Sequence, residues 1–166
     1  PPAGKWARQM TNADVQLRRI GPADCDLICR HRTEMFRDAG RPADILKEMH
    51  QPFAEWLAPR LADGRYFGFM AEQNGEPIGG IGLMEIDWPP HPSHPHEARR
   101  GYVLNLFVEE HVRGRGIGLL LMQAAHQAFA ERGVAYLILH ATDAGRPLYE
   151  RLGWSATSEM AMAARR

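Results

Sequence analysis

The sequence has little cysteine and no excess of either charge, and both shortages exclude classes of protein. Only two cysteines occur among 166 residues, Cys25 and Cys29, and a spacing of four places them on one face of a helix, where a disulfide has poor geometry. We therefore expect free thiols, not a disulfide scaffold or a cysteine metal site. Lysine and arginine together number 20, as do aspartate and glutamate, so no overall positive field favours nucleic acid or a membrane as a partner.

Long apolar runs are missing as well. The longest, at 119–122 and 134–139, fall far short of the roughly 20 apolar residues that span a bilayer, so no transmembrane helix is expected. Residues 1–6 carry no apolar segment of the kind that a secretory signal needs, and we expect a cytoplasmic protein. The composition, 45% hydrophobic and 24% charged, is typical of one globular domain, which we place at 14–166 after a loose N-terminal arm at 1–13.

The first third of the chain predicts one strand followed by two helices. Residues 15–20 form the expected strand, and apolar residues over 27–40 recur at helical spacing up to a glycine. Pro42 opens a second helix that ends near Gly64. Pro52 removes an internal hydrogen bond from that helix, so we expect a kink or a break into two short helices.

A hairpin and one parallel crossover follow. Asn74 and Gly75, between two runs rich in aromatic and branched residues, are a strong signal for a two-residue hairpin turn. Residues 134–140 are nearly all apolar, as expected of a strand buried on both faces. The expected elements are strands at 66–72, 78–86, 102–108, 134–140 and 155–163, helices at 116–132 and 147–152, and a proline-rich, solvent-facing loop at 88–96.

The order of these elements defines the fold class. The hairpin contradicts the strict alternation of strands and helices in a doubly wound nucleotide-binding fold. The helix between 102–108 and 134–140 makes those two strands parallel. We therefore predict an α+β fold with a mixed, mostly antiparallel sheet flanked by helices.

The most informative motif lies between the end of a strand and the start of a long helix. Alternate glycines let a ligand approach the backbone, and the first turn of a helix offers unpaired amide donors, so we expect a phosphate group to bind there. Two arginines favour the same anion, whereas a tight turn with solvated arginines is the plainer alternative. Leu119 excludes both a P-loop and a dinucleotide-binding fingerprint, which need lysine or glycine at that position. The motif consists of Arg113, Gly114, Arg115, Gly116, Ile117 and Gly118.

The pattern R-x-x-G-x-G at 113–118, preceded by L-F-V at 106–108 and followed by G-R-P-L-Y-E-R-L-G-W at 145–154, resembles the GNAT superfamily, the GCN5-related N-acetyltransferases. The resemblance implies that the 113–118 loop binds the pyrophosphate of acetyl-CoA, and that backbone groups at Phe107 and Val108 hold the acetyl carbonyl and the pantetheine arm. It also implies that the two central parallel strands splay apart in a V that receives acetyl-CoA.

By the same resemblance, Tyr149 is the acid that protonates the departing thiolate of CoA. A phenol with an ordinary pKa near 10 is protonated at neutral pH and can donate to sulfur. Packing of a short helix against the sheet is the alternative role for this aromatic ring. The family pattern has asparagine and alanine where this chain has Thr142 and Gly145, so the side chain at 142 is not assigned a pantetheine contact.

The acceptor site and the general base are left open by the sequence. Glu34, Glu85, Asn105 and His140 are candidates for the base or for holding a water that leads to it, and each also has an ordinary structural role as a solvated carboxylate or a strand-end hydrogen-bonding group. Met35, on the first helix, lies where the resemblance places part of the acceptor pocket. We take Glu34, Met35, Glu85 and Asn105 as candidate substrate-binding residues.

Three histidines gather in the proline-rich loop, at His91, His94 and His96. Zinc sites usually rest on rigid elements with four ligands, and the nearest carboxylate here belongs to Glu97. We predict no metal site and expect a mobile loop.

These features together predict an acetyl-CoA-dependent N-acetyltransferase. The acetyl group would pass directly to a primary amine in a ternary complex, with a small-molecule acceptor as the first choice and a peptide amine as the second. No metal, nucleic acid or membrane is expected to take part. A non-catalytic acyl-CoA-binding sensor or regulatory module is the alternative, because it needs the phosphate-binding loop but no proton donor. A third hypothesis is self-association as a homodimer through the last strand.

Overall fold

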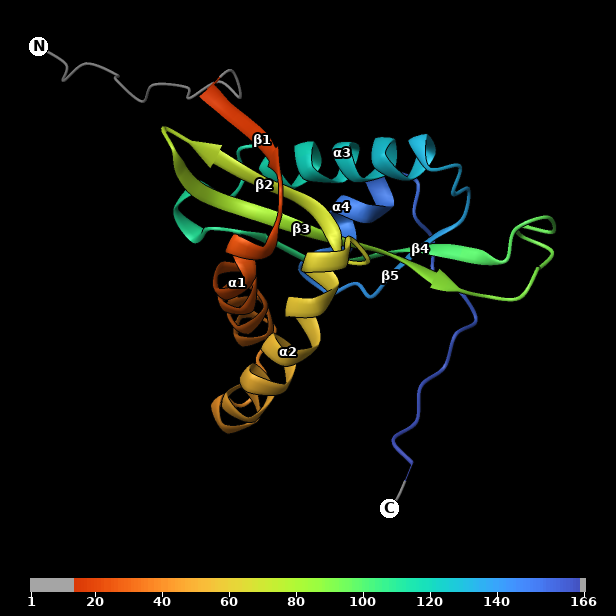
Figure 1. Ribbon diagram of the computed structural model, residues 1–166, viewed down its shortest axis with the longest axis horizontal. Coiled ribbons are helices and arrows are strands. Elements are labelled where there is room, and N and C mark those ends of the chain that lie inside the picture. Colours follow the sequence, from red (N-terminus) through yellow and green to blue (C-terminus); the bar gives the residue numbers. More distant parts are fainter. Residues whose placement is uncertain (1–13, 165–166) are drawn as a thin grey trace, which may run out of the picture.

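The structure is a computed structural model that describes residues 14–164, and the arm predicted at 1–13 lies outside the described residues. Within the described range, strands and helices follow one another in the predicted order as far as residue 151 (Figure 1). The strands are β1 (Val15–Arg19), β2 (Phe67–Gln73), β3 (Glu76–Asp87), β4 (Arg99–Val108) and β5 (Leu137–Leu139). The helices are α1 (Cys25–Asp38), α2 (Ala43–Asp63), α3 (Ile117–Glu131) and α4 (Arg146–Arg151).

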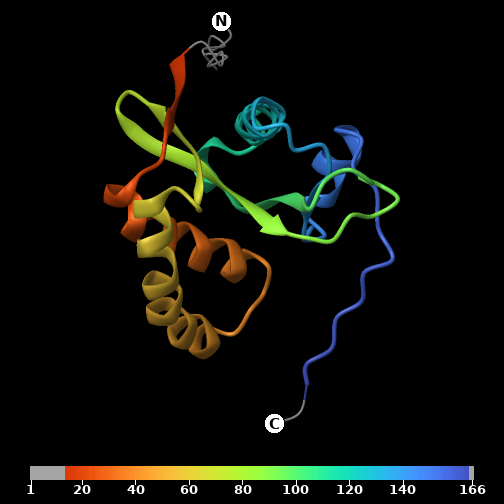
Figure 2. The ribbon, with the colours of Figure 1, turned by 45° about the vertical axis from the view of Figure 1, so that its right-hand side comes forward.

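All of these strands belong to one sheet in the order β1-β2-β3-β4-β5. β1 to β4 pair with their neighbours antiparallel, and β4 pairs with β5 parallel. α1 and α2 cover one face of the sheet, and α3 covers the other (Figures 1 and 2). The predicted α+β fold with a mixed, mostly antiparallel sheet is therefore confirmed.

Each face of the sheet has its own hydrophobic core. On one face, Ile117, Leu121 and Ala125 of α3 recur every four residues and are almost completely buried against β3 and β4, as the amphipathic spacing of this helix predicts. On the other face, α1 and α2 pack around Leu57 and Tyr66. At the hairpin, Asn74 and Gly75 have φ angles of 54° and 80°, the left-handed pair that a type I′ turn requires.

The predicted break in the second helix does not occur. α2 is one helix of 21 residues, although it contains Pro52 and Pro59. A proline inside a helix costs about 3 kcal/mol, whereas burial of Leu46, Phe53 and Leu57 contributes about 1.5–3 kcal/mol for each side chain. Packing against α1 therefore outweighs the lost hydrogen bond.

Within residues 14–164, no helix has the length and apolar character that crossing a membrane requires.

Two strand predictions near the C-terminus are wrong. β5 has three residues instead of the expected seven, and all three are half-buried because no further described strand covers its outer edge. The strand predicted at 155–163 is absent, and Met160 and Met162 are 94% and 88% exposed. The alternating apolar residues of this segment have no partner strand among the described residues, so their pattern alone does not produce a ladder.

The histidine-containing loop between β3 and β4 is anchored to the sheet through one of its histidines. His94 is only 4% exposed; its Nε2 accepts a hydrogen bond from Nε of Arg100 at 3.0 Å, and its Nδ1 lies 3.1 Å from the carbonyl oxygen of Glu97. The guanidinium of Arg100 lies between the rings of Trp88 and Tyr136, 4.1 and 4.7 Å from their centroids. Cation–π contacts and this hydrogen bond therefore anchor the loop to the sheet at His94. Residues 89–93, 95 and 96 are exposed, so the expected solvent-facing loop is confirmed for most of its length, and its mobility stays a prediction. Among residues 14–164, no three histidine, cysteine or acidic side chains gather as a metal site would require.

Candidate functional site

The centre of the candidate site is the place where β4 and β5 part. Parallel pairing runs only from Gly101 opposite Leu137 to Val103 opposite Leu139. β4 continues to Val108, so on the β5 side its last five residues have no partner strand within the described chain. β5, which is the edge strand of the described sheet and not a central one, therefore parts from β4 after Leu139, as the predicted V-shaped splay requires. This leaves backbone donors and acceptors of β4 available to a ligand.

A bulge in β4 lies at the start of this unpaired edge. The register against β3 shifts between Gly80 and Gly82, so Asn105 and Leu106 both lie opposite Ile81. Asn105 has a φ of 54°, a left-handed conformation that asparagine tolerates better than most residues. Because a bulge redirects the backbone locally, it changes the direction in which the following amide groups point. These groups include those of Phe107 and Val108, the residues predicted to hold the acetyl and pantetheine groups.

The loop at 113–118 presents the start of α3 without a cap. Gly114 and Gly116 have φ angles of 75° and 82°, and the first main-chain bond of the helix runs from the amide of Leu120 to the carbonyl of Gly116 at 3.0 Å. The amides of residues 117–119 thus precede the helical hydrogen-bond ladder, no side chain caps them, and no acidic residue lies in the first turn. Such a helix N-terminus favours the binding of an anion.

The arginines of this loop make contacts within the chain. Nε of Arg113 donates to the carbonyl oxygen of Val108 at 2.8 Å, its Nη2 pairs with Asp38 at 2.5 Å, and its guanidinium lies 5.5 Å from the ring centroid of Phe107. Nη2 of Arg115 donates to the carbonyl oxygen of His111 at 3.2 Å. Arg113 therefore anchors the loop to β4 and α1. Binding of an anion by Arg113 and Arg115, beside the amides of the helix start, stays a prediction.

Tyr149 lies on α4, next to the start of α3. Leu148 contacts the position where a Cβ on Gly118 would be, at 3.3 Å, so α4 packs directly on the first turn of α3. Tyr149 is half-buried, its ring lies 6.3 Å from that of Trp154, and burial raises the pKa of its phenol. A Cβ at Gly145 would lie 3.1 Å from the Tyr149 ring, so the glycine lets the start of α4 lie close to this ring.

Within the described chain, the hydroxyl of Tyr149 makes no hydrogen bond, although the ring packs against the core under α3. A phenol that is protonated, enclosed at its ring and unpaired at its oxygen can donate a proton to a neighbouring group. The packing role and the proton-donor role are therefore compatible.

The candidate acceptor residues are not all brought together. Asn105 is 5% exposed and lies on the face covered by α1 and α2. Glu34 pairs with Arg37 on the surface of α1, with the half-buried Met35 next to it. Glu85 pairs with Arg99 and Arg132 on the α3 side of the sheet, so it is separated from Asn105 by the sheet. His140 follows β5 directly, with its ring 5.7 Å from that of Tyr102, where the two strands part.

Sequence reasoning missed the partners of Asn105. Its Nδ2 donates to the hydroxyl of Tyr66 at 2.8 Å, and its Oδ1 accepts from Nη1 of Arg32 at 2.7 Å. Gly82 makes room for this arrangement, since a Cβ there would lie 1.9 Å from the Tyr66 hydroxyl oxygen. The available signal was Arg32 itself, which lies four residues after Ile28 on the apolar face of α1, where a charge is unusual.

His31 supplies a testable property of the same region. It is 2% exposed, its ring lies 4.8 Å from that of Phe107, and burial lowers its pKa to about 4. The unfolded chain takes up this proton near pH 6.5, so stability falls as the pH decreases from about 6.5 to about 4 and is fully present above that range. We expect His31→Gln to abolish this decrease in the free energy of unfolding at low pH, which amounts to up to about 3 kcal/mol in the unmodified protein. Urea unfolding at several pH values checks this, and the same pH slope in both proteins would contradict it.

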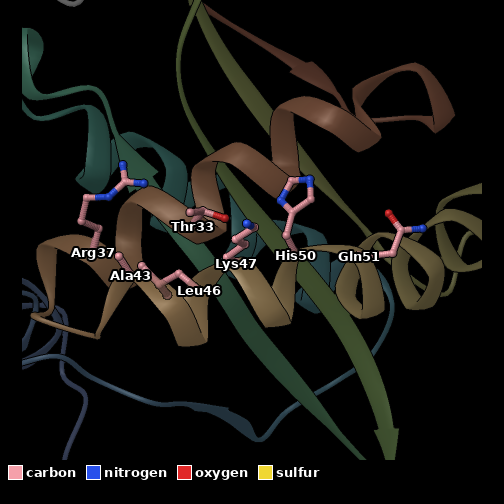
Figure 3. Close-up of a pocket in the computed structure, with 7 residues that line it drawn as sticks. All are labelled: Thr33, Arg37, Ala43, Leu46, Lys47, His50 and Gln51. Atoms are coloured by element: carbon pink, nitrogen blue, oxygen red, sulfur yellow. The ribbon is translucent and has the colours of Figure 1, made fainter.

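Two cavities lie outside this centre. One, of about 280 Å³, lies in the groove between α1 and α2 on the side away from the sheet (Figure 3). The other, of about 390 Å³, lies between β2 and α3. Neither is lined by the 113–118 loop or by Tyr149, so neither corresponds to the predicted site of acetyl-CoA. The first cavity is lined by Thr33, Arg37, Ala43, Leu46, Lys47, His50 and Gln51.

Comparison with known proteins identifies the family. Residues 28–154 match the model of the acetyltransferase (GNAT) family. A GCN5-related N-acetyltransferase from Ralstonia eutropha is 55% identical to this chain, over 90% of this chain and 98% of that protein, with a TM-score of 0.89. The chain therefore belongs to the GNAT acetyltransferase family, a family of acyltransferases.

More distant structures share the fold. A predicted acetyltransferase from Clostridium acetobutylicum, solved with acetyl-CoA, is 25% identical over 90% of this chain and 96% of that one, with a TM-score of 0.82. An aminoglycoside N-acetyltransferase in complex with CoA is 17% identical over 92% of this chain and 95% of that one, with a TM-score of 0.67. Among curated protein sequences, none matches this chain.

Proposed function

We propose that this protein is an acetyl-CoA-dependent N-acetyltransferase that acetylates a primary amine, with a small molecule as the first choice of acceptor. The observation that carries the proposal is the juxtaposition of an unpaired β4 edge with the uncapped start of α3. The β4 edge supplies main-chain donors for an acyl carbonyl, and the start of α3 supplies main-chain donors for a diphosphate. Family membership and relatives solved with acetyl-CoA or CoA support the same reading.

In this proposal each part of the chain has a role in binding. The amides of residues 117–119 hold the pyrophosphate of acetyl-CoA, and Arg113 keeps the loop in place through Val108 and Asp38. Main-chain groups at Phe107 and Val108 orient the pantetheine arm and the thioester carbonyl. This fixes the thioester carbon next to the bulge at Asn105, on the side from which an acceptor enters between α1 and β4.

The chemical step is a direct transfer. The amine nitrogen forms a bond to the thioester carbon, the carbon–sulfur bond breaks, and Tyr149 gives its proton to the departing sulfur, so that CoA leaves as the thiol. The amine gives up one proton to a base or to a water that leads to one, and the phenol regains its proton from solvent. Of the candidate bases, His140 stands where β4 and β5 part, and we assign it this role.

Two measurements test the proposal. Titration calorimetry with acetyl-CoA and with CoA should give binding heat for both, and release of CoA thiol should depend on an added primary amine. Failure of acetyl-CoA and CoA to bind to folded protein would refute the proposal. Binding without thiol release for any amine would favour the non-catalytic acyl-CoA-binding module.

A further inference from the structure

Arg32 is a guanidinium group with no carboxylate partner among residues 14–164. It contrasts with Arg30 and Arg37 on the same helix, which pair with Glu109 and Glu34. Nη1 of Arg32 donates to Asn105, but Nε is enclosed by protein without an acceptor. A charge that is partly withdrawn from water and left unpaired is costly, so its retention needs an explanation.

The groups around Arg32 are neutral. Its guanidinium carbon lies 4.9 Å from the ring centroid of Phe36 and 4.5 Å from that of Phe53, and the other groups that act on its charge are Tyr66, Tyr102 and Cys29. Burial lowers the pKa of this guanidinium, although arginine stays protonated at neutral pH. Two acidic side chains act on members of this cluster, Asp26 on Cys29 and Glu159 on Tyr102, and neither acts on Arg32. No carboxylate is therefore among the groups that act on the charge of Arg32.

Arg32 also lies where an acceptor would approach. Its partner Asn105 is the bulge residue of β4, two positions before Phe107, and both face the α1 side of the sheet. Arg32 is half-buried, so part of its side chain is accessible to solvent. Its Nη2 makes no hydrogen bond within the described chain and is the donor that a ligand can contact. The two phenylalanine rings hold the guanidinium plane in place, which lowers the entropy cost of binding.

From this geometry we infer that the acceptor is an amino acid whose carboxylate binds to Arg32. The inference rests on the proposed function and specifies its substrate class. In an α-amino acid, one carbon separates the amine from the carboxylate, so a carboxylate on Arg32 places the amine next to the β4 bulge, where the thioester carbonyl is proposed to lie. A guanidinium binds a carboxylate through charge-assisted hydrogen bonds, whereas it has no comparable interaction with a neutral carboxamide.

The test compares acids with their matched amides. Thiol release is measured with a panel of L-amino acids, each paired with its own carboxamide, for the unmodified protein, for Arg32→Gln and for Arg32→Lys. Arg37→Gln is the control variant, because Arg37 lies five residues further along α1, about one and a half turns, on the surface. Calorimetry with acetyl-CoA and the thermal midpoint show that each variant is folded and still binds the acetyl donor.

We expect the unmodified protein to prefer the acid by at least about tenfold in kcat/KM over its amide. Arg32→Gln should lower kcat/KM for the acid by about 10- to 100-fold, mainly through KM, and leave the amide unchanged. Arg32→Lys should keep part of the preference, and Arg37→Gln all of it. If Arg32→Gln fails to fold, Arg32→Lys decides the matter, because loss of the planar fork must still reduce the ratio of acid to amide.

The inference is overturned if acid and amide react equally, if Arg32→Gln affects both equally, or if no member of the panel is acetylated. In these cases the proposed function stands as long as acetyl-CoA still binds and another primary amine supports thiol release. If acetyl-CoA does not bind to the folded, unmodified protein, the proposed function and the substrate class both fail.

Discussion

Replacing Gly116 by glutamate should abolish measurable binding of acetyl-CoA while the protein remains folded. Gly116 has a φ of 82° and directly precedes α3, so a side chain at this position carries a backbone strain of about 1–2 kcal/mol. The new carboxylate would also lie at the helix start that is proposed to bind a diphosphate, where like charges repel. We expect the Kd for acetyl-CoA, measured by calorimetry, to rise at least about 100-fold, or about 2.7 kcal/mol.

Gly64→Glu is the matched control for this variant. Gly64 ends α2 with a φ of 80°, and no atom lies within 4 Å of the position of its missing Cβ. The substitution therefore adds the same backbone strain and the same negative charge, at a position that lies far along the chain from the proposed diphosphate site. It should lower the free energy of unfolding to a similar extent and leave the Kd for acetyl-CoA unchanged. Equal losses of affinity in both variants would show that strain, and not the loop, controls binding.

The parts of the fold that follow local rules were predictable from the sequence. Alternate apolar residues, the turn at Asn74 and Gly75, and the glycines at 40 and 64 identify strands, a hairpin and helix ends because each signal acts over a few residues. The continuity of α2 through Pro52 was not predictable in this way, since it depends on packing against α1. The strand expected at 155–163 failed for the same reason: a ladder needs a partner, which a single segment does not specify.

In the candidate site too, the local features were predictable from the sequence and the long-range contacts were not. The loop at 113–118 is one continuous segment, so its glycines and its position before a helix were visible in the sequence. The contact between Arg32, Asn105 and Tyr66 joins α1, β4 and the residue before β2, and only the folded chain brings them together. The left-handed φ of Asn105 depends in turn on the register of β4 against β3. Long-range polar contacts of this kind leave no periodic trace in a sequence.

Replacing Tyr149 by phenylalanine should lower kcat about 100-fold, equivalent to about 2.7 kcal/mol in the activation barrier. The ring fills its place beside Trp154 in either form, so stability and the Kd for acetyl-CoA should change little. What is lost is the proton for the departing sulfur, because burial raises the pKa of the Tyr149 phenol and keeps it protonated over the neutral range. Amine-dependent thiol release under saturating acetyl-CoA measures this change.

Tyr136→Phe removes a hydroxyl of the same kind from a tyrosine whose ring packs on Arg100 and His94, and it should keep full activity. The leaving group supplies a sharper criterion. A thioester whose thiol has a lower pKa needs less protonation as it departs, so the deficit of Tyr149→Phe should shrink with such an acetyl donor. If the deficit is the same for both donors, the hydroxyl acts through position and not as an acid. If Tyr149→Phe is fully active, Tyr149 only packs α4 against the sheet.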